Sequence, residues 1–156
     1  MIETKPADLR AALGVERWVA DVTAASPFDS LDSLLTTAHA AATPLTPTEI
    51  DEAIAHHPRI GEKPVGTGTA QNFSRREQGD EGDTETLAAI AAGNAAYEER
   101  FGRIFIIRAA RRSKAEILGE LERRLALPPD EEISIVGEQL RDIALLRLQT
   151  LYSEEA

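Results

Sequence analysis

The sequence predicts an all-α protein: a single compact multi-helix domain over residues 1–156, with a long Gly/Pro loop and one short extended apolar segment. Apolar residues recur at helical spacing through nearly the whole chain, whereas the alternation of β-branched residues that is typical of strands is scarce. Aromatic residues make up only 4% of the chain, so the predicted core is aliphatic. A chain of about 150 residues can enclose a core and a pocket in one domain.

Four helices are predicted before the loop, at residues 7–13, 15–25, 29–42 and 47–56. The second helix places Trp18 on its apolar face, which predicts a core position for the indole. Pro27 and Pro44 end the second and third helices, because the residue before a proline disfavours helical geometry. Thr46 and Glu49 have the spacing of a capping box, which marks the start of the fourth helix.

A long stretch without apolar periodicity, residues 57–73, follows these helices and contains five Gly or Pro residues. A loop of this length in a compact domain is usually functional or disordered. Three further helices are predicted after it, at residues 83–101, 113–127 and 130–152. Gly102 is a typical stop for the first of these helices. The apolar run at 104–107 is either a buried extended segment or a buried turn of helix, since periodicity does not separate the two.

The composition excludes several classes of protein. The chain has 27 acidic and 17 basic residues and a formal net charge of −10, which works against non-specific binding of nucleic acid. It contains no cysteine, which excludes disulfides, thiolate nucleophiles and cysteine-based metal sites. No apolar stretch approaches the ~18 residues of a membrane span, and the N-terminus lacks the features of a signal peptide. We therefore expect a cytoplasmic domain without membrane or nucleic-acid partners.

A charged residue, Arg147, interrupts the apolar stripe of the last predicted helix. The stripe advances by three, four and three residues, and the next step of four reaches Arg147; its members are Ile133, Val136, Leu140 and Ile143. The guanidinium is therefore expected to point toward the core. One explanation is structural: an ion pair with an interior carboxylate, or a stem lying along the rim of the core. The other is functional: an anchor for an anionic substrate.

Positive charge is concentrated in residues 100–114. This basic segment holds six basic residues and no acidic one: Arg100, Arg103, Arg108, Arg111, Arg112 and Lys114. A solvated face at a helix start is the usual explanation for such a cluster. A contact with a protein or nucleic acid, and an attracting field for an anionic substrate, are the alternatives.

Two imidazoles lie at the entrance to the loop. His56 and His57 end the fourth helix directly before Pro58, where a histidine can carry a proton near neutral pH. The alternative without a catalytic role is a surface histidine at the helix end that interacts with the helix dipole. A metal site is disfavoured, because adjacent histidines do not share a helix face and only His39 remains as a third imidazole.

A second capping-box pattern follows the loop at Ser74 and Glu77. These residues cap a helix or, together with Gln78, present a hydroxyl, a carboxylate and an amide around a helix N-terminus. Such an N-terminus is itself a site for an anion. The pattern alone leaves both interpretations open.

Two strings of residues frame the loop: HPRIGEKP at 57–64 and SRREQ at 74–78. Four more blocks follow in the chain: YEERFG at 97–102, FIIRA at 105–109, RSKAEIL at 112–118 and IALLRL at 143–148. With Trp18 and the pair Pro27-Phe28, these blocks resemble in order and spacing the 2-oxo-4-hydroxy-4-carboxy-5-ureidoimidazoline (OHCU) decarboxylases of uric acid degradation. The sequence departs from the family pattern at Arg103-Ile104, where Phe-Pro is common, and at Arg111, where glycine is common.

The resemblance implies an all-helical, cofactor-free enzyme, often dimeric, that converts OHCU to (S)-allantoin and carbon dioxide. It assigns catalytic roles to His57 and Glu77. It implies substrate contacts for nine further residues: Pro58, Ser74, Gln78, Phe105, Ile106, Ile107, Arg108, Ala109 and Arg147.

We therefore expect a cytoplasmic, homodimeric carboxy-lyase of purine catabolism that acts on OHCU without a metal or cofactor. In this interpretation His57 is the acid/base, Glu77 orients it and Arg147 anchors the anion. One alternative is a decarboxylase or lyase of a related ureido acid. The other is a non-catalytic helical interaction domain that holds an acidic partner through the basic segment.

Overall fold

The computed structural model of this protein describes residues 1–55, 84–110 and 112–153. These ranges contain seven helices: α1 (Pro6–Ala12), α2 (Glu16–Ala25), α3 (Leu31–Ala41), α4 (Pro47–Ile54), α6 (Thr84–Phe101), α7 (Lys114–Leu125) and α8 (Pro129–Tyr152). The predicted all-α class is confirmed, and the ends of the predicted helices differ from these bounds by two residues at most. Within the described ranges, no helix is both long and apolar enough to cross a membrane.

The chain forms two compact units. One combines Met1–His56 with Gly137–Ala156, and the other is His57–Val136. The single domain predicted over residues 1–156 stays a prediction.

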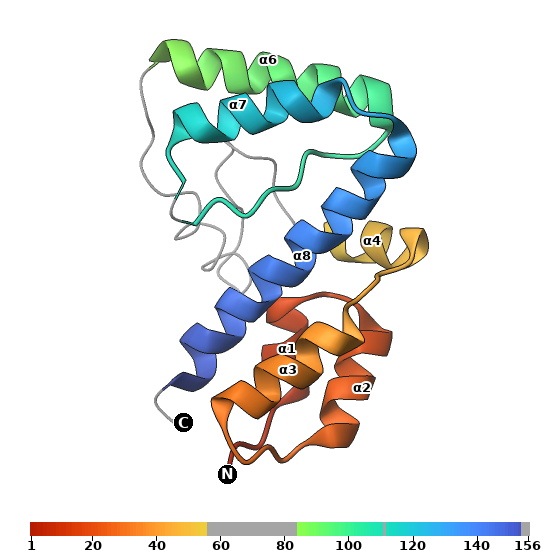
Figure 1. Ribbon diagram of the computed structural model, residues 1–156, viewed down its shortest axis with the longest axis vertical. Coiled ribbons are helices and arrows are strands. Elements are labelled where there is room, and N and C mark those ends of the chain that lie inside the picture. The colour runs from red at the N-terminus through yellow and green to blue at the C-terminus, as the bar shows by residue number, and fades with distance from the viewer. Residues whose placement is uncertain (56–83, 111, 154–156) are drawn as a thin grey trace. The chain divides into compact units, whose positions relative to one another are not determined.

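The first unit contains α1, α2 and α3, drawn in red to orange in Figure 1, and Trp18 is a buried residue of α2. The indole is fully buried, and its Nε1–H donates to the Ala38 carbonyl oxygen of α3 over 3.0 Å. This confirms the predicted core position. An antiparallel bridge pairs Ile2 with Phe28, the N–H of each donating to the carbonyl of the other over 2.6 and 2.7 Å.

The start of α4 has the predicted capping box. The Glu49 N–H donates to Thr46 Oγ1 over 3.1 Å, and the Thr46 N–H donates to the Glu49 carboxylate over 3.0 Å. Arg17 of α2 donates to both oxygens of the same carboxylate, from Nε over 2.7 Å and from Nη2 over 3.1 Å. These bonds from Arg17 hold the pKa of Glu49 at about 2. Local capping and one bidentate ion pair thus fix α4, the last helix described before residue 56.

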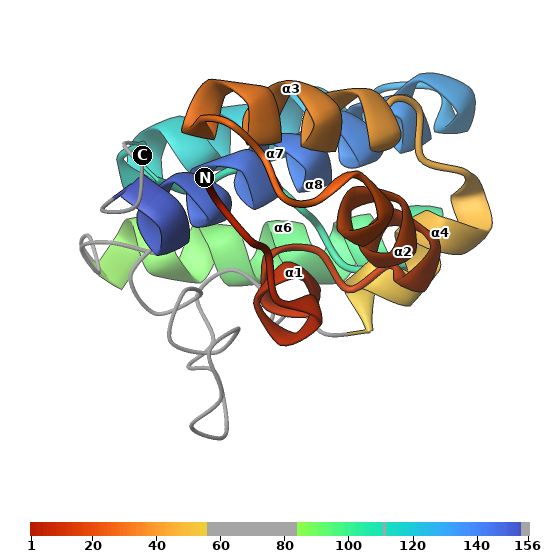
Figure 2. The same cartoon turned by 90° about the horizontal axis from the view of Figure 1, so that it is seen from below.

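In the second unit, α6 and α7 lie side by side and run in the same direction (Figures 1 and 2). The connection between them must therefore return along both helices. α6 ends as predicted at Gly102, which adopts a φ of 74° and donates its N–H to the Glu98 carbonyl over 2.9 Å. Glycine adopts this left-handed conformation without the steric cost that a side chain would bring.

Gly93 of α6 allows the close approach of α7. A Cβ at this position would lie 2.5 Å from Cδ2 and 3.0 Å from Cγ of Leu121, which is fully buried. We expect Gly93→Ala to lower the free energy of unfolding, since overpacking costs about 1–3 kcal/mol and alanine regains only about 1 kcal/mol of helix propensity. Urea denaturation measures the change.

The matched control is Gly119→Ala in α7, where an added Cβ meets nothing within 4 Å. Here the helix propensity acts alone, so we expect a gain in stability of roughly 0.5–1 kcal/mol. Equal shifts for the two variants would contradict the packing role of Gly93.

Candidate active site

Six of the predicted site residues lie in the described ranges: Phe105, Ile106, Ile107, Arg108, Ala109 and Arg147. The other five lie outside them: the catalytic candidates His57 and Glu77, and the substrate contacts Pro58, Ser74 and Gln78. Arg111 also lies outside the described residues. The roles assigned to these residues stay predictions.

The binding segment, residues 105–109, is part of the connection that returns from the end of α6 to the start of α7 (Figure 1). It forms neither a helix nor a paired strand, and four of its five residues are buried. Of the two structures left open by the sequence, the buried non-helical segment is therefore present. The sequence could not decide because a run of four apolar residues fits either structure.

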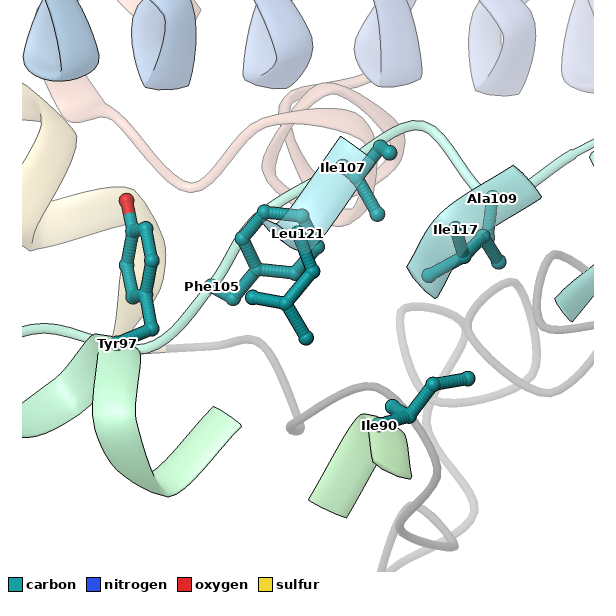
Figure 3. Packing of buried hydrophobic residues seen from close by; sticks show 7 residues of the cluster. All are labelled: Ile90, Tyr97, Phe105, Ile107, Ala109, Ile117 and Leu121. Carbon is teal, nitrogen blue, oxygen red and sulfur yellow. The ribbon is translucent and has the colours of Figure 1, made fainter. Parts of the chain in front are cut away.

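Alternate side chains of the binding segment belong to the core between α6 and α7 (Figure 3). Phe105, Ile107 and Ala109 cluster with residues of both helices: Ile90, Tyr97, Ile117 and Leu121. Phe105 meets the Tyr97 ring edge-on at a centroid distance of 5.2 Å. Since these three side chains are used for packing, the groups of the segment outside the cluster are its backbone and the side chains of Ile106 and Arg108.

A buried ion pair lies against the binding segment. Arg124 of α7 and Glu132 of α8 are 0% and 1% exposed. Arg124 donates to the carboxylate from Nε over 2.9 Å and from Nη2 over 2.5 Å. Its Nη1 donates to the carbonyl oxygen of Ile106 over 2.7 Å, and its guanidinium carbon lies 4.5 Å from the centroid of the Phe105 ring. One guanidinium thus joins the carboxylate to two consecutive residues of the segment.

Tyr97 of α6 completes this network, because its hydroxyl donates to the Glu132 carboxylate. Burial, followed by the hydrogen bond to Glu132, raises the pKa of Tyr97 well above its ordinary value. The phenol therefore stays protonated and remains a donor to the carboxylate throughout the neutral range. The network thus has one member on α6, one on α7 and one on the part of α8 that belongs to the second unit.

The buried pair of Arg124 and Glu132 was not predicted from the sequence. The signal was available, since Ile117 and Leu121 form an apolar stripe whose next step of three reaches Arg124. In α8, Glu132 is buried at the position preceding Ile133, which had been assigned to the stripe. If the stripe of the last helix begins at Glu132 in place of Ile133, a carboxylate lies on the apolar face of that helix.

The guanidinium of Arg147 is buried as predicted, with 3% of the residue exposed. Its Nη1 donates to the carbonyl oxygens of Ala11 and Ala12, over 3.0 and 3.4 Å, at the end of α1. Carbonyls in the last turn of a helix lack intrahelical donors, so Arg147 satisfies groups that would otherwise need water. This gives Arg147 a structural role; its role as an anion anchor stays a prediction.

The described residues of the basic segment are not uniformly exposed. Arg103, Arg108 and Arg112 are half-buried and Lys114 is buried, which leaves Arg100 exposed. Arg100 donates to the Leu127 carbonyl over 2.8 Å and lies over the Phe101 ring. The described residues of the segment therefore differ in exposure, and a fully solvated face is present only at Arg100 among them.

The sequence matches the family model of the OHCU decarboxylases over residues 3–149. It is 27% identical over 153 residues to the uric acid degradation bifunctional protein TTL of Arabidopsis thaliana, covering 94% of this chain and 47% of that protein. It is 33% and 37% identical over 99 residues to the OHCU decarboxylases of Mus musculus and Amia calva, covering 61% of this chain and 56% and 57% of those proteins. The chain spans about half the length of these curated relatives.

Two solved structures share the fold. The crystal structure of OHCU decarboxylase in the presence of (S)-allantoin matches with a TM-score of 0.76 and 26% identity, covering 94% of this chain and 98% of that one. The crystal structure of (S)-allantoin synthase matches with a TM-score of 0.68 and 17% identity, covering 93% of this chain and 48% of that one. At that identity the second match supports the fold alone.

Proposed function

Because this chain belongs to the OHCU decarboxylase family, we propose that it catalyses the decarboxylation of OHCU to (S)-allantoin and carbon dioxide in uric acid degradation. The observation that carries the proposal is the structural similarity to an OHCU decarboxylase whose crystal structure was solved in the presence of (S)-allantoin. The match covers 94% of this chain and 98% of that one. The order of the sequence blocks around the loop and in the binding segment supports the same conclusion.

In the proposed reaction the substrate supplies its own electron sink. The bond from the ring carbon to the carboxylate breaks and carbon dioxide leaves. The electron pair forms a double bond to the adjacent ring carbon, and the nitrogen of the former C=N takes up a proton from solvent. His57, oriented by Glu77, removes the proton from the neighbouring hydroxyl, and a proton is delivered to the adjacent carbon to give (S)-allantoin. General acid–base catalysis of this kind contributes about 10²–10⁴-fold.

Binding is assigned to groups that recognise an anion and amide-like carbonyls. Arg147 and Gln78 are proposed to hold the carboxylate and the ureido group, and Pro58 and Ser74 are proposed as further substrate contacts. Because Phe105, Ile107 and Ala109 pack into the core, we assign their contribution to backbone N–H groups. We assign apolar contact with the substrate to the Ile106 side chain, and positive charge within the segment to Arg108.

The direct test is turnover of OHCU generated in place from urate by its upstream oxidation and hydrolysis. We expect rapid appearance of (S)-allantoin, seen as a circular dichroism signal of one sign, that is unaffected by a chelator. Racemic allantoin at the spontaneous rate would contradict the proposal. Turnover of a different ureido acid, without turnover of OHCU, would favour the alternative lyase.

The proposal also includes a cytoplasmic location and a homodimer, both expected from the sequence and its resemblance. Light scattering during size-exclusion chromatography tests the dimer, because the monomer mass is 16.9 kDa. A single species of monomer mass at enzyme-assay concentration would rule it out.

For Arg147→Met we expect KM for OHCU to rise about ten- to hundredfold, since the lost interaction is a hydrogen bond between charged groups. The free energy of unfolding should fall by about 1–3 kcal/mol, because the Ala11 and Ala12 carbonyls lose a donor. Steady-state kinetics and urea denaturation give the two quantities. Arg141→Met, on the same helix and half-buried, is the matched control and should leave KM unchanged. An unchanged KM for Arg147→Met would remove the anchor role.

A further inference from the structure

We propose that Arg124, held by Glu132, is a positioning residue that orients the Ile106–Ile107 peptide of the binding segment for substrate. The inference rests on the proposed function, which assigns substrate contacts to this segment. Arg124 itself is fully buried and acts through the backbone that it holds.

The first argument is the geometry of one peptide plane. Arg124 Nη1 donates to the Ile106 carbonyl over 2.7 Å, so that carbonyl points toward α7. In a trans peptide the carbonyl of one residue and the N–H of the next point in opposite directions. The bond from Arg124 therefore directs the Ile107 N–H away from α7.

The second argument is the state of that N–H group. Ile107 is buried, with 3% of the residue exposed. Its N–H donates to no acceptor within the part of the chain that the structure describes. Buried backbone N–H groups almost always have a partner, and a ligand carbonyl or carboxylate oxygen is one that would satisfy this group.

Few backbone hydrogen bonds hold the binding segment in the described part of the chain. Among the described residues, the backbone of 105–107 makes no hydrogen bond to other backbone groups, and Ala109 accepts one from the Arg112 N–H over 3.1 Å. Arg124 contacts both Phe105, through its ring, and Ile106, through its carbonyl. Arg124 thereby restrains the binding segment. In a β-sheet, hydrogen bonds from neighbouring strands would have this role.

The fourth argument is chemical. A buried ion pair is often replaceable by apolar residues without loss of stability, so stability alone does not explain its presence. Arginine has five N–H donors in a rigid fork, which here bind the carboxylate and the carbonyl at the same time. Lysine has one nitrogen and cannot reproduce both sets of bonds.

The test is a variant that removes the link while avoiding an unpaired buried charge: Tyr97→Phe/Arg124→Met/Glu132→Leu. We expect it to fold with native circular dichroism and to lose about ten- to hundredfold in kcat/KM, as misplacement of a binding group does. Hydrogen exchange measured by mass spectrometry should accelerate at least tenfold in peptides containing 105–109, while other peptides follow the global stability. Tyr97→Phe alone keeps the link to Ile106 and is the matched control, with expected kcat/KM within twofold of wild type.

Each outcome decides a separate point. Native kcat/KM in the triple variant overturns the inference, and so does lost activity with unchanged exchange in 105–109. If the triple variant fails to fold, Arg124→Lys keeps the charge beside Glu132, and native kcat/KM in that variant overturns the inference equally. A wild-type chain that does not turn over OHCU refutes the proposed function, while the exchange measurement still decides whether Arg124 holds the segment.

Discussion

The variant His57→Asn should lose about 10²–10⁴-fold in turnover of OHCU, the contribution typical of general acid–base catalysis. Asparagine retains a side-chain amide of similar size but cannot exchange a proton near neutral pH. The fold should be retained, since the change concerns one residue of a loop predicted to be functional. The measurement is the initial rate of (S)-allantoin formation on freshly generated OHCU, together with thermal unfolding.

The matched control for this substitution is His56→Asn. The adjacent histidine has the same chemistry and nearly the same place in the sequence, yet the family resemblance assigns it no role. Its turnover should remain within about twofold of wild type. Near-native turnover in His57→Asn, or an equal loss in both variants, would remove the assignment of His57 as the acid/base.

A large effect on stability is expected for Arg124→Met. The substitution leaves the Glu132 carboxylate, 1% exposed, with the Tyr97 hydroxyl as its remaining donor in the network described above. Breaking one side of a buried ion pair costs about 3–5 kcal/mol, because a charge stays buried without its counter-charge. The Ile106 carbonyl loses its donor as well. Urea denaturation at neutral pH should show this loss in the unfolding midpoint.

The neighbouring Arg123→Met is the matched control. Arg123 lies on the same helix and forms an ion pair with Glu120 over 2.8 Å, but 53% of its side chain is exposed. Exposed pairs contribute roughly 0–1 kcal/mol, so this variant should unfold close to wild type. Similar losses in both variants would show that burial of the Arg124 pair has no special energetic role.

Helices could be predicted from the sequence because their signals are local. The capping box of Thr46 and Glu49 and the glycine stop at Gly102 both act within one turn of helix. The apolar face that buried Trp18 also repeats within one helix. Such signals depend on neighbours three or four residues away, so no knowledge of the tertiary structure was needed.

The course of the binding segment could not be predicted in this way. Its four apolar residues are compatible with a strand-like segment or a helical turn. The choice follows from the direction of α6 and α7, since two helices that run the same way need a connection that returns along their length. Extended backbone covers that distance with far fewer residues than a helix does.

From the sequence alone came the helical class, the limits of the helices, the family and the inward orientation of Arg147. Tertiary structure alone decided what the buried charges contact: Arg147 reaches carbonyls 136 and 135 residues away in α1, and Arg124 joins Glu132 of the next helix to the carbonyl of Ile106. The physical reason is that a helical stripe specifies which side chains face inward, whereas the partner of a buried guanidinium depends on which other elements pack against that face.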